Sequence, residues 1–132
     1  MEIDEQLIFL TKAQESLAGA QSEFINGRYN NCANRSYYAC FQAAIAALLD
    51  AGIQPTGAQW GHDFVQAQFN GQLINRRKRY PTSLRNTLEQ NYRLRETADY
   101  RRDHVRELRA ARAVRRTEEF LDAIRRPGEG ER

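Results

Sequence analysis

The stretch YNNCANRSYYACFQAAIAALLDA, residues 29–51, decides the fold. Its large apolar side chains recur at the three- and four-residue steps of an α-helix, and alanines fill many positions between them. Apolar residues therefore cover a wide arc, which is typical of a helix at the centre of a bundle. The alanines allow close helix approach, and Gly52 follows where a helix commonly ends. The large residues of this stripe are Tyr37, Tyr38, Phe41, Ile45, Leu48 and Leu49.

The flanking segments predict further helices. A first helix is expected over 4–25 with its end at Gly27, a short one near 60–70, one from Pro81 to Tyr100, and a last one over 104–125. The residues expected to face the core are Ile3, Leu7, Leu10, Leu17 and Phe24 in the first helix, and Leu108, Ala111, Val114, Leu121 and Ile124 in the last.

These elements predict an all-α protein, an antiparallel bundle of four to five helices. A chain of 132 residues is long enough for one domain with a core that needs no disulfide or metal. We assign the bundle to residues 1–126 and expect residues 127–132 to form a disordered C-terminal tail.

Charge is distributed unevenly along the chain. Residues 1–75 carry three basic and seven acidic side chains, whereas residues 76–132 carry seventeen basic and ten acidic ones. Eighteen of the twenty basic residues are arginine, which binds phosphate with two parallel hydrogen bonds and stacks on bases. The C-terminal half therefore presents either a nucleic-acid surface or an ordinary solvated, arginine-rich helix face.

Several functional classes are disfavoured. No apolar run approaches the ~20 residues that span a bilayer, and the acidic start is unlike a secretory signal, so we expect a cytoplasmic protein without membrane contact. Cys32 and Cys40 lie eight residues apart on one predicted helix, too far to bridge each other, and we interpret them as reduced packing residues. His62 and His104 belong to no metal-binding motif, so neither a metal nor another cofactor is expected.

Two pairs of polar residues interrupt the apolar pattern. Arg35 and Gln42, seven residues apart, share the flank of the central stripe, where they can reach a groove or simply meet solvent. Arg95 and Asp99 lie four apart on the stripe of the third long helix, near Tyr100. Because buried charges must be paired, they form either a structural ion pair or part of a polar groove between helices.

The stretch Asn34-Arg35-Ser36-Tyr37-Tyr38-Ala39-Cys40-Phe41-Gln42-Ala43-Ala44 resembles the N-R-x-Y-Y-A-x-F-H-A-A signature of prokaryotic HEPN-domain proteins. His62-Asp63-Phe64-Val65, followed by Phe69, is similar to the family's H-x-x-V/L-x-x-x-F segment. The run from Tyr92 to Tyr100, with Arg95, Ala98 and Asp99, is similar to its L-x-x-x-R-x-x-A-D-Y segment. The C-terminal stretch from Glu118 to Ile124 fits the same pattern, so the resemblance covers nearly the whole chain.

The resemblance implies a HEPN-like bundle that commonly forms a homodimer. Many members are ribonuclease toxins, often encoded beside a small nucleotidyltransferase that acts as antitoxin. Active members cleave RNA without metal through an R-x(4–6)-H motif, in which Arg neutralises the phosphate and His moves a proton. Here Arg35 matches the arginine, but Gln42 stands at the histidine position and cannot act as an acid or base near neutral pH. His62 is the alternative proton donor, and Asn34, Tyr38, Arg95, Asp99 and Tyr100 are expected to line the polar groove.

Three functions are compatible with these residues and this resemblance. The first is a dimeric module that binds RNA or a nucleotidyltransferase, with weak or lost nuclease activity, in which Gln42→His is expected to raise cleavage. The second is an active metal-independent ribonuclease toxin that uses His62. The third is a purely structural interaction module. The wide apolar arc of residues 29–51 is expected to form the dimer contact, and Arg95→Ala is expected to cost ~3 kcal/mol or more if Asp99 is buried.

Overall fold

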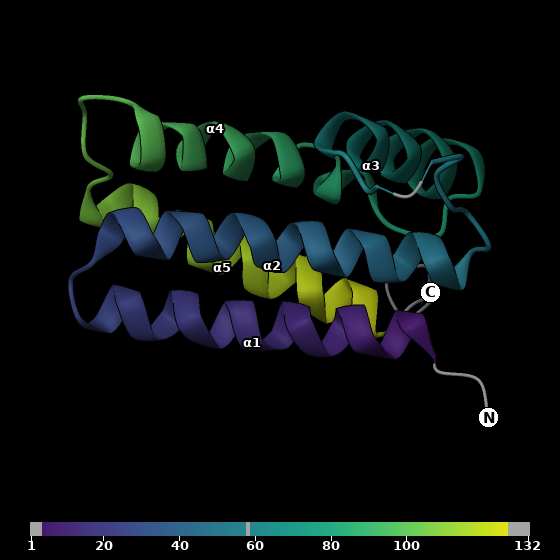
Figure 1. Ribbon diagram of the computed structural model, residues 1–132, viewed down its shortest axis with the longest axis horizontal. Helices are drawn as coiled ribbons and strands as arrows, with labels where there is room; N and C mark the ends of the chain where they lie inside the picture. Colours follow the sequence, from purple (N-terminus) through teal and green to yellow (C-terminus); the bar gives the residue numbers. More distant parts are fainter. Residues whose placement is uncertain (1–3, 58, 127–132) are drawn as a thin grey trace.

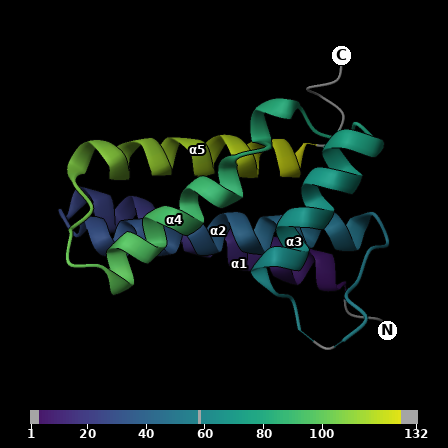
Figure 2. The same cartoon turned by 90° about the horizontal axis from the view of Figure 1, so that it is seen from above.

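Helices α1 (Glu5–Ile25) and α2 (Tyr29–Asp50) run antiparallel, side by side, along the length of the molecule (Figure 1). The computed structural model describes residues 4–57 and 59–126, and these contain helices and loops but no strand. Helix α5 (Glu107–Arg125) packs against α1 and α2, and α4 (Thr87–Tyr100) crosses α2 obliquely (Figure 2). The predicted all-α bundle is confirmed.

 

The turns at both ends of α2 have the predicted glycines. Gly27 and Gly52 adopt φ values of +75° and +79°, in the left-handed region that side chains other than glycine rarely enter. Each glycine directly follows the C-cap residue of its helix, which is the C′ position where glycine is expected. The boundaries predicted for the first two helices therefore agree with the structure to within one residue.

The segment between α2 and α4 is more helical than predicted. Helix α3 (His62–Gln68) continues directly into the π-helix η1 (Phe69–Arg76), so helical structure extends six residues beyond the expected end at 70. The predicted helix start at Pro81 is wrong, because Pro81 is extended and is followed by the 3₁₀ turn η2 (Thr82–Leu84). The long helix α4 begins at Thr87.

Helix α5 also begins later than predicted. The backbone N–H of Val105 donates to Oδ1 of Asn30 over 2.9 Å, which ties this segment to the start of α2 in a non-helical conformation. The helix starts at Glu107, and Leu108 in its first turn is 60% exposed and does not face the core. Leu121 and Ile124 are buried as predicted.

Small residues form the contact between α1 and α2. On α1 the buried positions are Ala13, Ser16 and Ala20, whereas Leu7, predicted for the core, is 59% exposed. The larger apolar side chains of α1 lie beside these small residues. Leu10, Leu17 and Phe24 are half-buried. The predicted contribution of Ile3 lies outside the described residues.

The apolar arc of α2 is covered within one chain. Helices α1, α3, α4 and α5 and the π-helix η1 all contact α2, and Ala39, Ala43 and Ala47 are buried. The width of the arc therefore gives no reason to expect a dimer contact through α2.

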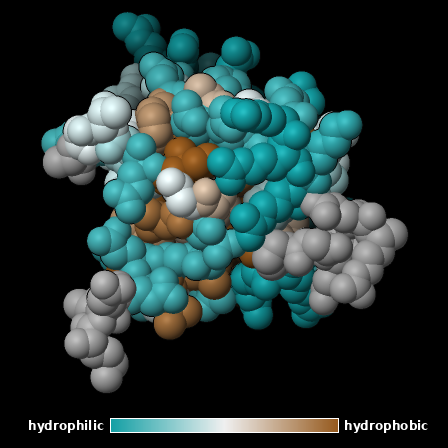
Figure 3. All heavy atoms as spheres, turned by 90° about the vertical axis from the view of Figure 1, so that its right-hand side faces the viewer, coloured by the Kyte–Doolittle hydropathy of each residue, from teal (hydrophilic) through white to brown (hydrophobic). Residues whose placement is uncertain are grey.

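Viewed from the end where α1 begins and α2 ends, apolar side chains gather at the centre of the face with polar ones around them (Figure 3).

 The predicted tail, residues 127–132, lies outside the described part of the chain.

Candidate functional site

A chain of polar contacts joins the N-terminal half of α2 to the C-terminal half of α4. The side-chain oxygen of Asn34 accepts hydrogen bonds from Nη2 and Nε of Arg35, at 2.7 and 3.1 Å. Nδ2 of Asn34 donates to Oδ2 of Asp99 over 2.9 Å. The same oxygen lies 3.3 Å from Nη1 of Arg95. Helical spacing gave no link between Arg35 and the pair Arg95 and Asp99, and the structure brings these three residues into one cluster through Asn34.

Four tyrosine rings surround the guanidinium of Arg95. Its central carbon lies 4.9 Å from the ring centre of Tyr37 and between 5.6 and 5.9 Å from those of Tyr38, Tyr92 and Tyr100. Such contacts stabilise a cation through the negative ring faces. Burial opposes the charge, but Tyr38, Tyr100, Tyr37 and Asp99 together raise the pKa of Arg95. Arg95 is therefore held as a cation, although its side chain is only 16% exposed.

His62, at the start of α3, joins the same cluster. Its Nδ1 lies 2.9 Å from the Tyr37 hydroxyl, and its ring stacks on Tyr92 with 3.9 Å between ring centres. Burial raises the pKa of Tyr37, so its hydroxyl keeps its proton and can donate to Nδ1. Nε2 of His62 and Nε of Arg95 are buried and have no hydrogen-bond partner among the described residues. Two nitrogens of the cluster are thus available to a ligand only if the surrounding rings move.

Gln42 does not join this cluster. It shares a face of α2 with Arg35 as predicted, but that face is turned toward α1. In the amide orientation that satisfies its neighbours, Nε2 donates to the carbonyls of Lys12 and Tyr38, at 3.0 and 3.1 Å, and lies 2.8 Å from Oγ of Ser16. The side chain proposed for the catalytic position is therefore part of the α1–α2 contact.

The aliphatic part of the Arg35 side chain lies against α1 at Gly19. A Cβ added to Gly19 of α1 would lie 3.5 Å from Cδ of Arg35, so the arginine lies across the helix at this point. Its guanidinium carbon lies 5.2 Å from the ring centre of Tyr38. Arg35 is exposed, and with Tyr100, which is 75% exposed, it forms the open side of the cluster.

Sequence reasoning missed two members of the site. Tyr37 and Tyr92 appeared within the motifs that resemble HEPN proteins but were not expected to line the groove, yet they contact both His62 and Arg95. The available signal was spacing, because Tyr92, Arg95 and Asp99 follow one another at three- and four-residue steps on one face of α4. Nothing in the sequence indicated that His62 would pack against that face.

Part of the basic run Arg76-Arg77-Lys78-Arg79, at the end of η1, has a structural role. Nη1 of Arg77 donates to the carbonyl of Ala51 over 3.0 Å, and Arg79 pairs with Asp50. Both arginines therefore place positive charge at the C-terminal end of α2, where carbonyl groups lack helical partners. These two side chains are less available to a nucleic acid than their sequence position indicated.

The buried cysteines behave as predicted packing residues. Cys32 and Cys40 have no exposed surface, and burial raises their pKa values to about 11 and about 12. No group of three or more His, Cys, Asp or Glu residues within 4–57 and 59–126 is arranged to hold a metal ion. None of the described helices has the length and apolar character needed to cross a membrane.

A family model of the HEPN domain matches residues 7–127. The chain belongs to the HEPN domain family. A relative from Methanocaldococcus jannaschii, named "Putative toxin MJ0605", is 29% identical over 119 residues, which cover 86% of this chain and 81% of the relative. The resemblance inferred from three sequence motifs is thereby confirmed, and the Arg95 cluster lies in the matched part of this HEPN domain.

Proposed function

We propose that this HEPN domain belongs to a toxin-related system and binds RNA at the open side of the Arg95 cluster, with weak cleavage or none. The toxin name of the M. jannaschii relative supports the general role. The observation that carries RNA binding is the exposed pair Arg35 and Tyr100 beside the fixed cation of Arg95. Arginine binds phosphate, and an exposed tyrosine ring offers a stacking surface for an unpaired base.

The closed position of His62 favours weak or absent cleavage. A general acid or base must come within hydrogen-bond distance of the proton that it transfers. His62 is enclosed by Tyr92 on its ring face and Tyr37 at Nδ1, and its Nε2 is buried. Gln42 is hydrogen-bonded to α1, and its amide neither gains nor loses a proton near neutral pH. Bound RNA would therefore meet a phosphate-binding arginine without an accessible proton donor.

The test is a comparison of binding and cleavage of a labelled single-stranded RNA of mixed sequence in excess chelator. Arg35→Ala and Tyr100→Ala are each expected to weaken binding about 10-fold, whereas Arg125→Ala, an exposed arginine at the end of α5, serves as the charge-matched control. Equal affinity for all four proteins would contradict the proposed surface and favour a purely structural interaction module.

A second candidate function is an active, metal-independent ribonuclease. The observation that favours it is the pair of buried, unpartnered nitrogens on His62 and Arg95 in one cluster. If Tyr92 moves when RNA binds, these atoms become a proton donor and a phosphate ligand. Robust cleavage that is lost in His62→Ala and retained in His104→Ala would select this function over the first.

The same proposal places the domain in the cytoplasm as a homodimer, with a nucleotidyltransferase as antitoxin partner. The homodimer and the antitoxin partner rest on what the HEPN resemblance implies. The apolar arc of α2 does not support a dimer contact, because it is covered within the chain. Light scattering at micromolar concentration is expected to give about twice the chain mass of 15.3 kDa. A monomer at that concentration would remove the homodimer from the proposal without affecting the RNA-binding surface.

A further inference from the structure

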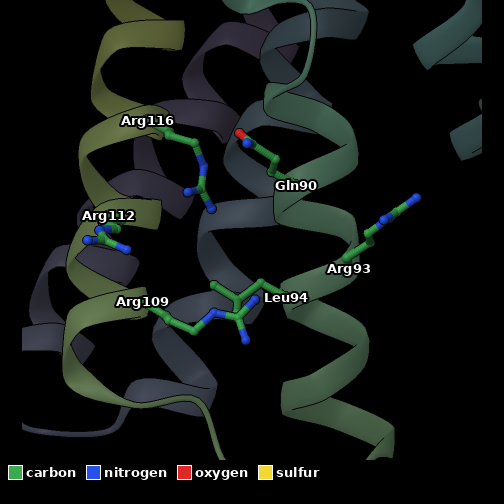
Figure 4. Close-up of a pocket in the computed structure, with 6 residues that line it drawn as sticks. All are labelled: Gln90, Arg93, Leu94, Arg109, Arg112 and Arg116. Atoms are coloured by element: carbon green, nitrogen blue, oxygen red, sulfur yellow. The ribbon is translucent and has the colours of Figure 1, made fainter.

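An arginine-rich cleft lies between α4 and α5, outside the Arg95 cluster. Gln90, Arg93 and Leu94 of α4 and Arg109, Arg112 and Arg116 of α5 line it, and its volume is about 270 Å³. Figure 4 shows that Arg109 and Arg116 extend from α5 toward α4, that Gln90 extends toward Arg116, and that Arg93 points away. The cleft exists because α4 crosses the bundle obliquely and diverges from α5.

 

The three arginines of α5 follow the period of the helix. Arg109, Arg112 and Arg116 stand three and four residues apart, so they occupy one face over about 10 Å of helix length. None of the six residues that line the cleft is acidic. Arg93, which points away from the cleft in Figure 4, has Glu89 as a partner at 3.6 Å. The charge of the α5 face is therefore not neutralised by any side chain that lines the cleft.

Arg116 is fixed in place by the core. Its Nε and Nη2 donate to Oδ1 of Asn91, at 3.2 and 2.9 Å, and Asn91 is fully buried. Nδ2 of Asn91 in turn lies 3.0 Å from Oγ1 of Thr117. Two of the five N–H groups of the guanidinium are used in this way, which leaves three for a ligand. An arginine that is already immobilised loses less entropy when it binds an anion.

The arginines destabilise one another in the absence of an anion. The pKa of Arg116 is lowered mainly by burial, with Arg109 and Arg112 adding repulsion. Like charges on one helix face are unfavourable, and a bound anion would convert this repulsion into attraction. No acidic side chain in the lining offsets this repulsion.

We propose that the α4–α5 cleft binds a compact anion with two or more adjacent phosphate groups. Guanidinium groups bind phosphate oxygens with paired hydrogen bonds, and a row of three favours several phosphates over a single carboxylate. The lining contains only one apolar side chain, Leu94, so the arginines provide most of the contacts to a ligand. Either a free polyphosphate chain, as in a nucleotide, or a nucleic-acid strand can supply these groups. The inference does not depend on RNA binding at the Arg95 cluster.

The probes are inorganic tripolyphosphate and a labelled single-stranded RNA of mixed sequence, at physiological ionic strength. The test variant is Arg109→Ala/Arg112→Ala, which keeps the contact between Arg116 and Asn91. The control is Arg76→Ala/Arg125→Ala, which removes the same charge from two exposed positions outside the cleft. Calorimetric titration is expected to show tripolyphosphate binding weakened about 10-fold or more in the test variant and little changed in the control.

The two probes distinguish the source of the phosphates. Equal weakening for tripolyphosphate and RNA in the test variant would assign the cleft to a nucleic-acid strand, and weakening for tripolyphosphate alone would assign it to a free polyphosphate. If the control weakens binding as much as the test variant, attraction is due to the overall charge and the proposal is overturned. It is also overturned if wild-type protein does not bind tripolyphosphate or if the test variant binds it with unchanged affinity. Melting curves of both variants establish that each is folded.

Discussion

Asn34 donates a hydrogen bond from α2 to Asp99 on α4 over 2.9 Å, and the same carboxylate oxygen contacts Arg95. Asp99 therefore has partners on two helices. We predict that Asn34→Ala and Asp99→Ala are coupled, because each removes the interaction that the other side chain would otherwise keep. A double-mutant cycle in thermal or urea unfolding is expected to give a coupling free energy of about 0.5–1.5 kcal/mol. Strictly additive effects would show that the hydrogen bond contributes nothing to stability.

Arg95→Ala is predicted to destabilise the fold by about 2 kcal/mol, through loss of four ring contacts and of a mostly buried side chain. The sequence-based expectation of ~3 kcal/mol or more assumed that Asp99 is buried and would be left without a partner. Asp99 instead retains Asn34 and some solvent contact, so the expected loss is smaller. Arg93→Ala is the matched control, because the Arg93 side chain is 76% exposed and its pair with Glu89 is a surface one. Equal melting temperatures for the two variants would contradict this account.

Gln42→His was expected from the sequence to raise cleavage, and its position in the structure reverses that expectation. A histidine at this place would face Ser16 and Lys12 of α1 and could not satisfy all the contacts of the amide. We predict no gain in cleavage and a loss of about 1 kcal/mol in unfolding free energy. The measurement is RNA cleavage in chelator together with melting of the same preparation. A clear gain in cleavage would mean that this part of the α1–α2 contact opens to RNA.

Gly19→Ala is predicted to stabilise the protein. An added Cβ would meet Cδ of Arg35 at 3.5 Å, which is ordinary van der Waals contact, and alanine favours a helix interior by about 0.5–1 kcal/mol over glycine. Arg35 would keep its place, so RNA binding is expected to stay unchanged. A lower melting temperature would instead show that Arg35 needs to approach the backbone of α1 more closely than an alanine allows.

Alkaline pH is predicted to destabilise the fold through Cys40. Burial raises its pKa from 9.0 to about 12, so the folded state retains a proton that the unfolded chain releases above pH 9.0. The stabilisation is complete below pH 9.0 and is lost as the pH rises toward the folded value. Cys40→Ser removes this titration while nearly conserving shape, and its melting temperature is expected to fall less steeply above pH 9.0 than that of the wild type. Parallel curves would contradict the assignment.

The sequence predicted the bundle well because its helices bury apolar stripes of regular period. It failed where a long-range contact overrides local preference, as when Asn30 holds Val105 outside α5. Spacing showed that Arg35 and Gln42 share a face of α2, but it does not reveal which neighbour that face meets. Likewise, His62 and Tyr37 are 25 residues apart, and their hydrogen bond depends on how α3 packs against α2. Helical spacing alone shows which residues share a face of one helix, whereas the composition of the site depends on how the helices pack together.

Asn91 is fully buried in the interior of the bundle, yet it holds Arg116, one of the side chains that line the arginine-rich cleft. Its amide holds Arg116 on one side and lies against Thr117 and Cys40 on the other. Any local opening that exposes the backbone around Asn91 must therefore also release Arg116. An anion that binds Arg116 would oppose this opening, and backbone amides in the middle of α4 and α5 would exchange their hydrogens more slowly. The rate of amide hydrogen exchange in the centre of the bundle is therefore expected to indicate whether an anion occupies the cleft at its surface.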